Sequence, residues 1–143
     1  MILIDTNVIS EIMRVRPHQA AAAWVDAQPA SSLFLCTPVL AELRYGIERL
    51  ADGRKKRELL TAVGRIEHEL YAGRILTFDQ PAAAQYARLA ASRERQGRRM
   101  HQMDALIAAI AAVHGATIAT RDIDDFTDLE LKLINPFEAP AAR

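Results

Sequence analysis

The sequence contains a single cysteine, Cys36, among its 143 residues. One cysteine excludes an intrachain disulfide and any zinc site built on repeated cysteines. Cys36 follows the apolar run Leu33-Phe34-Leu35, so we expect a buried thiol that packs as a small core residue. The sequence therefore gives no support to a disulfide-stabilised scaffold or to a cysteine nucleophile.

Long hydrophobic runs are also missing. No apolar stretch approaches the roughly 20 residues that a membrane-spanning helix needs. The N-terminal residues carry no basic region before their apolar run, and an acid, Asp5, follows at once, which is not the pattern of a secretion signal. We expect a cytoplasmic protein that does not contact membrane.

The chain has no net charge, because 18 basic side chains balance 18 acidic ones. No global charge therefore steers the molecule toward a polyanion. The distribution is uneven, however: basic residues exceed acidic ones by three over residues 44–58 and by four over 88–99, and acidic residues exceed basic ones by four over 121–138. Basic stretches of this kind can hold phosphates locally while the protein stays neutral overall.

Other site types are poorly represented. Aromatic residues make up 6% of the chain and form no strip on which bases could stack. The four histidines show no metal-ligand spacing, and no Ser-His-Asp or Cys-His grouping is evident. Nucleophilic catalysis by a side chain is therefore not indicated.

The chain does contain a regular alternation of short apolar runs and amphipathic segments. We expect strands at 2–4, 33–36, 75–78, 117–120 and 131–134, and helices near 6–13, 18–27, 37–50, 55–71, 81–96 and 100–114. Thr6 or Asn7 is the expected cap of the first of these helices, and Thr37 of the third. Alternating strands and helices predict one α/β domain with a parallel sheet that helices flank.

Four acidic residues are placed so that this fold would gather them. Asp5 and Asp122 follow predicted strands, whose carboxyl ends form sites in open α/β sheets. Glu42 and Asp104 lie near the starts of predicted helices, among apolar or small neighbours on the same face. Ionised carboxylates on such faces are costly, and a shared cation relieves that cost. An oxygen-rich site of this kind suits Mg²⁺ or Mn²⁺ and the hydrolysis of phosphodiester bonds by metal-activated water.

Three of the four acids also have an ordinary structural explanation, and Asp104 is the hardest to explain in that way. Glu42 can form an ion pair with Arg44 or Arg49, and Asp5 can act as a helix cap. Asp122 stands in an acidic stretch with Asp124, Asp125 and Asp128 that can simply face solvent. The metal-site hypothesis therefore depends on all four acids together.

Six stretches, in order along the chain, resemble the PIN-domain ribonucleases, and within them the VapC-type toxins of the FitB-like branch. The stretches are Ile4-Asp5-Thr6-Asn7-Val8-Ile9-Ser10-Glu11, Val39-Leu40-Ala41-Glu42-Leu43-Arg44-Tyr45-Gly46, Ala72-Gly73-Arg74-Ile75-Leu76, Asp104-Ala105-Leu106-Ile107-Ala108, Ala119-Thr120-Arg121-Asp122 and Asn135-Pro136-Phe137. The resemblance implies a PIN-like three-layer α/β fold, with a central parallel sheet flanked by helices. It assigns residues 1–137 to one PIN domain, and we expect residues 138–143 to form a flexible tail.

The resemblance also implies a Mg²⁺- or Mn²⁺-dependent endoribonuclease. It implies four catalytic acids that together hold the metal: Asp5 and Asp104 as the main ligands, and Glu42 and Asp122 as ligands that act through water. Asn7 and Thr120 are the implied supporting residues. Asp125 competes with Asp122 for the fourth acidic position. Arg121, Arg98 and Arg99 are weaker candidates for contacts with RNA phosphates.

The implied partners are an RNA substrate, a cognate antitoxin that binds operator DNA, and a second copy of the chain in a homodimer. Two other functions stay open at this point. One is a non-catalytic PIN-like module that acts with its partner as an operator-bound regulatory complex. The other is a response-regulator-like domain, but that class has paired acids early in the chain, and Asp5 stands alone after its strand.

Overall fold

Five short strands form one parallel sheet in the computed structural model, which describes residues 1–138. The strands are β1 Ile2–Ile4, β2 Leu33–Cys36, β3 Ile75–Leu76, β4 Thr117–Ala119 and β5 Leu133–Ile134. Their order in the sheet is β3-β2-β1-β4-β5, and every neighbouring pair is parallel. β1 and β2 consist only of apolar residues and cysteine, as is usual for parallel strands covered on both faces.

The strand order reverses between β1 and β4, and this reversal positions the site. The chain runs outward from β1 through β2 to β3, and then returns to the other side of β1 for β4 and β5. Ile4 pairs with Ala119, and the backbone N–H of Asp5 donates to the Ala119 carbonyl at 3.0 Å. Asp5 and Thr120 therefore leave the sheet side by side, where open α/β sheets form their binding sites.

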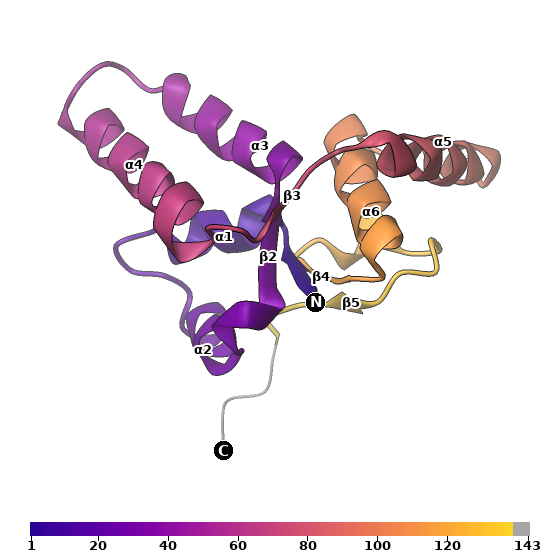
Figure 1. The fold of residues 1–143 in the computed structure, drawn as a ribbon, viewed down its shortest axis with the longest axis horizontal. Coiled ribbons are helices and arrows are strands. Elements are labelled where there is room, and N and C mark those ends of the chain that lie inside the picture. Colours follow the sequence, from indigo (N-terminus) through magenta and orange to yellow (C-terminus); the bar gives the residue numbers. More distant parts are fainter. Residues whose placement is uncertain (139–143) are drawn as a thin grey trace.

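Four of the six helices form two pairs that stand on different sides of the sheet. The α-helices are α1 Thr6–Ile12, α2 Gln19–Ala27, α3 Thr37–Glu48, α4 Arg54–Arg65, α5 Gln80–Arg95 and α6 Gln102–His114, with 3-10 turns at Ala30–Ser32 and Ile123–Phe126 and a π-helical turn at Ile66–Leu70. In Figure 1 the pair α3 and α4 stands on one side of β2, and the pair α5 and α6 stands on the other.

The core lies between the sheet and these helices. The side chains of Leu3, Ile4, Leu35 and Ile118 are fully buried. α6 is the most deeply buried helix, and it presents alanine and isoleucine to the sheet over Ala105–Ala111. Small alanine side chains let a helix approach the sheet closely, so α6 brings its first turn, which contains Asp104, near the strand ends.

Several sequence expectations need correction in detail. Neither Thr6 nor Asn7 caps α1: Asp5 does, because its Oδ1 accepts from the N–H of Thr6 at 2.8 Å. Thr37 is the first helical residue of α3, and its cap position is taken by Cys36. The third and fifth strands are shorter than expected, at two residues each.

The expected helix over 55–71 is divided into two parts. α4 ends at Arg65, and the backbone then widens into the π-helical turn, where the N–H of Tyr71 donates to the carbonyl of Ile66, five residues back. Gly73 follows with a φ of +75°, a conformation that glycine adopts without steric cost and that stops the segment as expected.

Two other expectations concern Cys36 and the end of the chain. Cys36 is fully buried, as expected, and burial raises the pKa of its thiol to about 12. The expected flexible tail over 138–143 lies outside the described residues apart from Glu138, and the assignment of 1–137 to a single domain stays a prediction. Over the part of the chain that is described, no helix combines the length and the apolar character that a bilayer crossing requires.

Candidate active site

Asp5 is the centre of a hydrogen-bond network at the carboxyl ends of β1 and β4. Its carboxylate is buried, with 5% of the residue exposed. One oxygen, Oδ1, accepts from the Thr6 N–H, and the other, Oδ2, accepts from the Thr120 hydroxyl at 2.7 Å and from the Asn7 side-chain amide at 3.2 Å. Both carboxylate oxygens are therefore oriented by neighbouring groups.

The charge on Asp5 remains costly in spite of these hydrogen bonds. Burial raises its pKa, and the hydrogen bonds from Thr120 and Thr6 only partly oppose that effect. The nearby carboxylates of Glu42 and Asp122 raise the pKa further. Asp5 is thus within electrostatic reach of two of the other predicted acids.

Thr120 and Asn7 connect Asp5 to Asp122. The fully buried Thr120 hydroxyl donates to Asp5 and accepts from the backbone N–H of Asp122 at 3.0 Å. The Asn7 amide nitrogen donates to Oδ2 of Asp122 at 2.9 Å, and the Asn7 carbonyl oxygen accepts from the N–H of Arg121 at 3.1 Å. Asn7 and Thr120 therefore contact the carboxylates that they are expected to support, and their part in the reaction stays a prediction.

Glu42 reaches the same place from α3. Its Oε1 accepts from the Thr6 hydroxyl at 2.7 Å. The expected alternative, an ion pair with Arg44 or Arg49, is not formed within residues 1–138: Arg44 pairs with Glu67 instead. Glu42 therefore belongs to the site through Thr6.

Thr6 was not among the predicted site residues. Its position directly after Asp5, in the same turn at the end of β1, is the sequence feature that points to this role. A hydroxyl there can donate to a carboxylate on the helix that follows the neighbouring strand. Thr6 does this for Glu42, which is on α3, the helix after β2.

Asp104 approaches from the first turn of α6 and is half-buried. Burial raises its pKa to about 6, and the charges of Asp125, Asp5 and Glu42 add to the effect. The nearby His101 acts in the opposite direction. The structure thus brings Asp104 close to the carboxylates that were expected to share its site.

The two candidates for the fourth acid have different neighbours. Asp122 is joined to Asp5 through Asn7 and Thr120. Asp125 is not part of this network, but of the carboxylates it has the strongest effect on the pKa of Asp104. Both acids are exposed, as expected for an acidic loop, yet each lies beside one of the two buried or half-buried aspartates.

The donor set suits a hard divalent cation, but the side chains are not arranged around one. It consists of carboxylate oxygens supported by hydroxyl and amide groups, which is the chemistry that Mg²⁺ and Mn²⁺ prefer. No three His, Cys, Asp or Glu side chains of residues 1–138 converge to hold an ion. The carboxylates of Asp5, Glu42 and Asp122 are instead turned toward Thr6, Asn7 and Thr120.

Comparison with known proteins assigns this sequence to a family. A sequence model of the PIN domain matches residues 2–131. The chain belongs to the PIN-domain family. It is 39% identical over 137 residues to the toxin FitB of Neisseria gonorrhoeae, with 96% of this chain and 99% of the relative covered. It is 41% identical over 141 residues to the VapC ribonuclease Y4jK of Sinorhizobium fredii, with 96% and 99% covered.

A solved structure shows the same fold as this PIN domain. The structure of FitAB bound to an IR36 DNA fragment superposes with a TM-score of 0.91 at 37% identity, and the match covers 100% of both chains. The resemblance carried by the six sequence stretches, and the PIN-like parallel sheet that it implied, are therefore confirmed.

The three arginines predicted to contact RNA differ in how the PIN domain uses them. Arg121 lies beside the site, with its guanidinium 3.8 Å from the centre of the Phe137 ring. Arg99 is exposed and lies 3.8 Å from Glu94. Arg98 is bound within the protein, because it donates to Asp128 at 2.8 Å.

Proposed function

We propose that this PIN domain is a metal-dependent endoribonuclease toxin that a cognate antitoxin neutralises. The observation that carries the proposal is the group of carboxylates at the ends of β1 and β4. Asp5 and Asp122 are joined there through Thr120 and Asn7, and Glu42 is joined to the same turn through Thr6. The names of the relatives, a toxin and a ribonuclease, support the same function.

Asp5 and Asp104 are the residues that would hold Mg²⁺ or Mn²⁺. An ion bound there would supply positive charge beside the phosphate and would lower the pKa of a bound water. The raised pKa values of Asp5 and Asp104 mean that both carboxylates gain from a nearby positive charge. Thr6 and Asn7 orient Glu42 and Asp122, which would accept hydrogen bonds from water and direct it toward the phosphate.

RNA phosphates would meet the site from the side of Arg121. Its half-exposed guanidinium is held against Phe137 and lies 3.9 Å from Glu11. The exposed Arg99, which lies 3.8 Å from Glu94, would exchange this partner for a second phosphate contact. Binding of this kind is sensitive to salt and independent of sequence.

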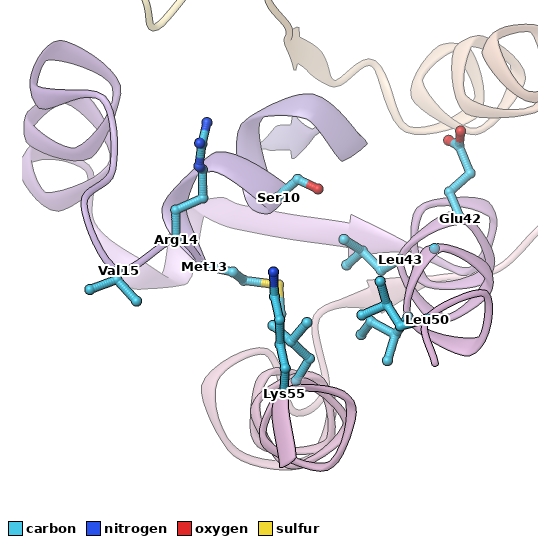
Figure 2. A pocket seen from close by; sticks show the side chains of 11 residues that line it. Ser10, Met13, Arg14, Val15, Glu42, Leu43, Leu50 and Lys55 are labelled. Carbon is cyan, nitrogen blue, oxygen red and sulfur yellow. The ribbon is translucent and has the colours of Figure 1, made fainter. Parts of the chain in front are cut away.

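We infer that the antitoxin binds an apolar surface, and in the described part of the chain two hollows that border α4 offer one. One, of 420 Å³, lies between α1, α3 and α4 and opens beside Glu42 (Figure 2). The other, of 660 Å³, lies between α1, α2 and α4 and includes Tyr71. We infer that an extended antitoxin segment covers these hollows, and that the antitoxin in turn binds operator DNA.

The proposal also includes a homodimer and a place in the cytoplasm. Light scattering of the purified chain tests whether the chain forms the dimer.

Cleavage of total cellular RNA tests the enzyme directly. Antitoxin-free protein is incubated with Mn²⁺, with EDTA, and as the Asp104→Asn variant, with the exposed Asp124→Asn as matched control. Discrete fragments that need both metal and Asp104 support the proposal. If folded protein with Mn²⁺ gives no fragments and still binds its antitoxin, the non-catalytic regulatory module is the better account.

A further inference from the structure

The loop over residues 122–130, here called the acidic loop, has an unusual backbone. It contains five acidic residues and the 3-10 turn Ile123–Phe126. Two of its residues, Asp128 and Glu130, have left-handed φ angles of 62° and 58°. Residues other than glycine adopt this conformation at a cost, and they keep it only where surrounding contacts hold the chain.

Arg93, near the end of α5, is one of these contacts. Only 5% of the residue is exposed. Its Nε donates to the Arg98 carbonyl at 3.1 Å, and its Nη1 donates to the carbonyls of Asp125 at 3.2 Å and Thr127 at 3.0 Å. Within residues 1–138 no carboxylate lies at ion-pair distance from it.

A buried guanidinium without a carboxylate partner is expensive. Arg93 offsets this cost with three backbone carbonyls, two of which belong to the acidic loop. Its planar fork fixes the directions of these hydrogen bonds, so the loop backbone is held in one position relative to α5.

Arg98 binds the same loop from the solvent side. Its guanidinium donates to the Asp128 carboxylate at 2.8 Å, to the Thr127 hydroxyl at 3.2 Å and to the Asp124 carbonyl at 3.3 Å. Arg93 and Arg98, which we call the arginine clamp, therefore both donate hydrogen bonds to the acidic loop, Arg93 from the buried side and Arg98 from the solvent side. The clamp explains how the left-handed Asp128 is maintained.

The acidic loop contains the two exposed acids of the site, Asp122 and Asp125. Asp122 stands at its start and receives the Asn7 amide, while Asp125, whose carbonyl Arg93 holds, lies near Asp104. We propose that Arg93, assisted by Arg98, is a positioning residue that keeps Asp122 and Asp125 beside Asp5 and Asp104. Because Arg93 is buried, we assign it the positioning of other residues and not contact with substrate, and this role rests on the proposed nuclease function.

Hydrogen exchange tests the clamp without reference to activity. The amide of Asp125 donates to the Asp122 carbonyl at 3.0 Å and so reports on the loop. In Arg93→Met we expect this amide to exchange about tenfold faster or more while the amides of β1 and β4 keep their protection. Arg93→Lys, which retains a donor, restores part of the protection. Leu89→Ala, a buried change one turn earlier on α5, is the matched control for general destabilisation.

Cleavage kinetics test the consequence for the site. In Arg93→Met we expect kcat to fall by about tenfold with little change in KM, because the carboxylates are displaced while the RNA-binding surface is kept. Arg93→Lys recovers part of kcat, and Leu89→Ala, compared below its melting temperature, keeps kcat. Combining Arg93→Met with Asp125→Asn gives less than the product of the two separate losses.

The proposal is overturned if Arg93→Met leaves loop exchange or kcat unchanged, or if Leu89→Ala reproduces both effects. Should Arg93→Met not fold, the exposed Arg98→Gln is expected to shift the same two measurements in the same direction, and its failure to do so has the same meaning. If the wild-type chain cleaves no RNA, the nuclease proposal fails, and loop exchange alone then supports or overturns the clamp.

Discussion

Replacing the half-buried Asp104 by asparagine should stabilise the metal-free protein while abolishing cleavage. The pKa of Asp104 is raised from 3.8 to about 6 by burial and by neighbouring carboxylates. The folded protein thus holds this proton more tightly than the unfolded chain. The Asp104 side chain therefore costs the folded protein nothing below pH 3.8, where it is protonated in both states. The free energy of unfolding falls as the pH rises from 3.8 through about 6.

The magnitude follows from this pKa difference. Moving the pKa from 3.8 to about 6 corresponds to about 3 kcal/mol before any allowance for solvent screening. Solvent screening of the half-exposed carboxylate reduces that cost, and the N-terminus of α6 favours a negative charge by about 0.5 kcal/mol. We therefore expect Asp104→Asn to be about 1 kcal/mol more stable than wild type at pH 7.5, and equal to it near pH 4.

Urea unfolding in EDTA, repeated from pH 4 to 7.5, measures this difference. The exposed Asp124→Asn is the control, because it removes one negative charge from the same region without relieving a buried one. The electrostatic account would be refuted if Asp104→Asn were no more stable than wild type at pH 7.5, or if the gain did not grow with pH. Adding Mn²⁺ should reverse the order, since the ion stabilises the form that binds it.

Three further changes probe the network and the partner surface. Thr120→Val leaves the Asp5 carboxylate without its shortest hydrogen bond, so we expect a loss of about 2 kcal/mol in the free energy of unfolding, measured with urea. Thr6→Val frees Glu42 near the surface, so we expect kcat to fall about tenfold while the melting temperature changes little; an unchanged kcat would argue against the role of Thr6. Leu50→Glu places a charge in the hollow beside α4, so we expect antitoxin affinity to fall about tenfold or more in calorimetry while RNA cleavage is kept; unchanged affinity would place the antitoxin elsewhere.

The strands and the buried acids were predictable because their causes are local. An apolar run that ends in an acid, as at Ile4 and Asp5, marks both the buried strand and the site at its end. The alanine-rich face of α6 likewise predicts close packing behind Asp104. The cap of α1 was misplaced because Asp5 has two roles: its Oδ1 caps the helix, and its other oxygen faces Thr120.

Arg93 shows what the sequence could not reveal. It stands in a stretch of five basic residues over 88–99 that indicates an exposed helix end, yet it is buried. Its acceptors, the carbonyls of Asp125 and Thr127, are more than thirty residues away along the chain, and a backbone carbonyl leaves no mark on residue identity. The π-helical turn at Ile66–Leu70 was missed for a similar reason, since the bond that defines it joins backbone groups.

The carboxylates of the site repel one another, and neighbouring side chains hold them in place in spite of that repulsion. Asp5 and Asp104 both have raised pKa values, so the apo protein bears an electrostatic cost near neutral pH. Thr6, Asn7 and Thr120 offset part of that cost at one end. Within residues 1–138 no side chain or backbone N–H donates to the Asp104 carboxylate, which makes Asp104 the acid with most to gain from a cation. Metal binding should therefore be coupled to stability chiefly through Asp104, and Mn²⁺ should stabilise wild type more than Asp104→Asn in the same unfolding experiment.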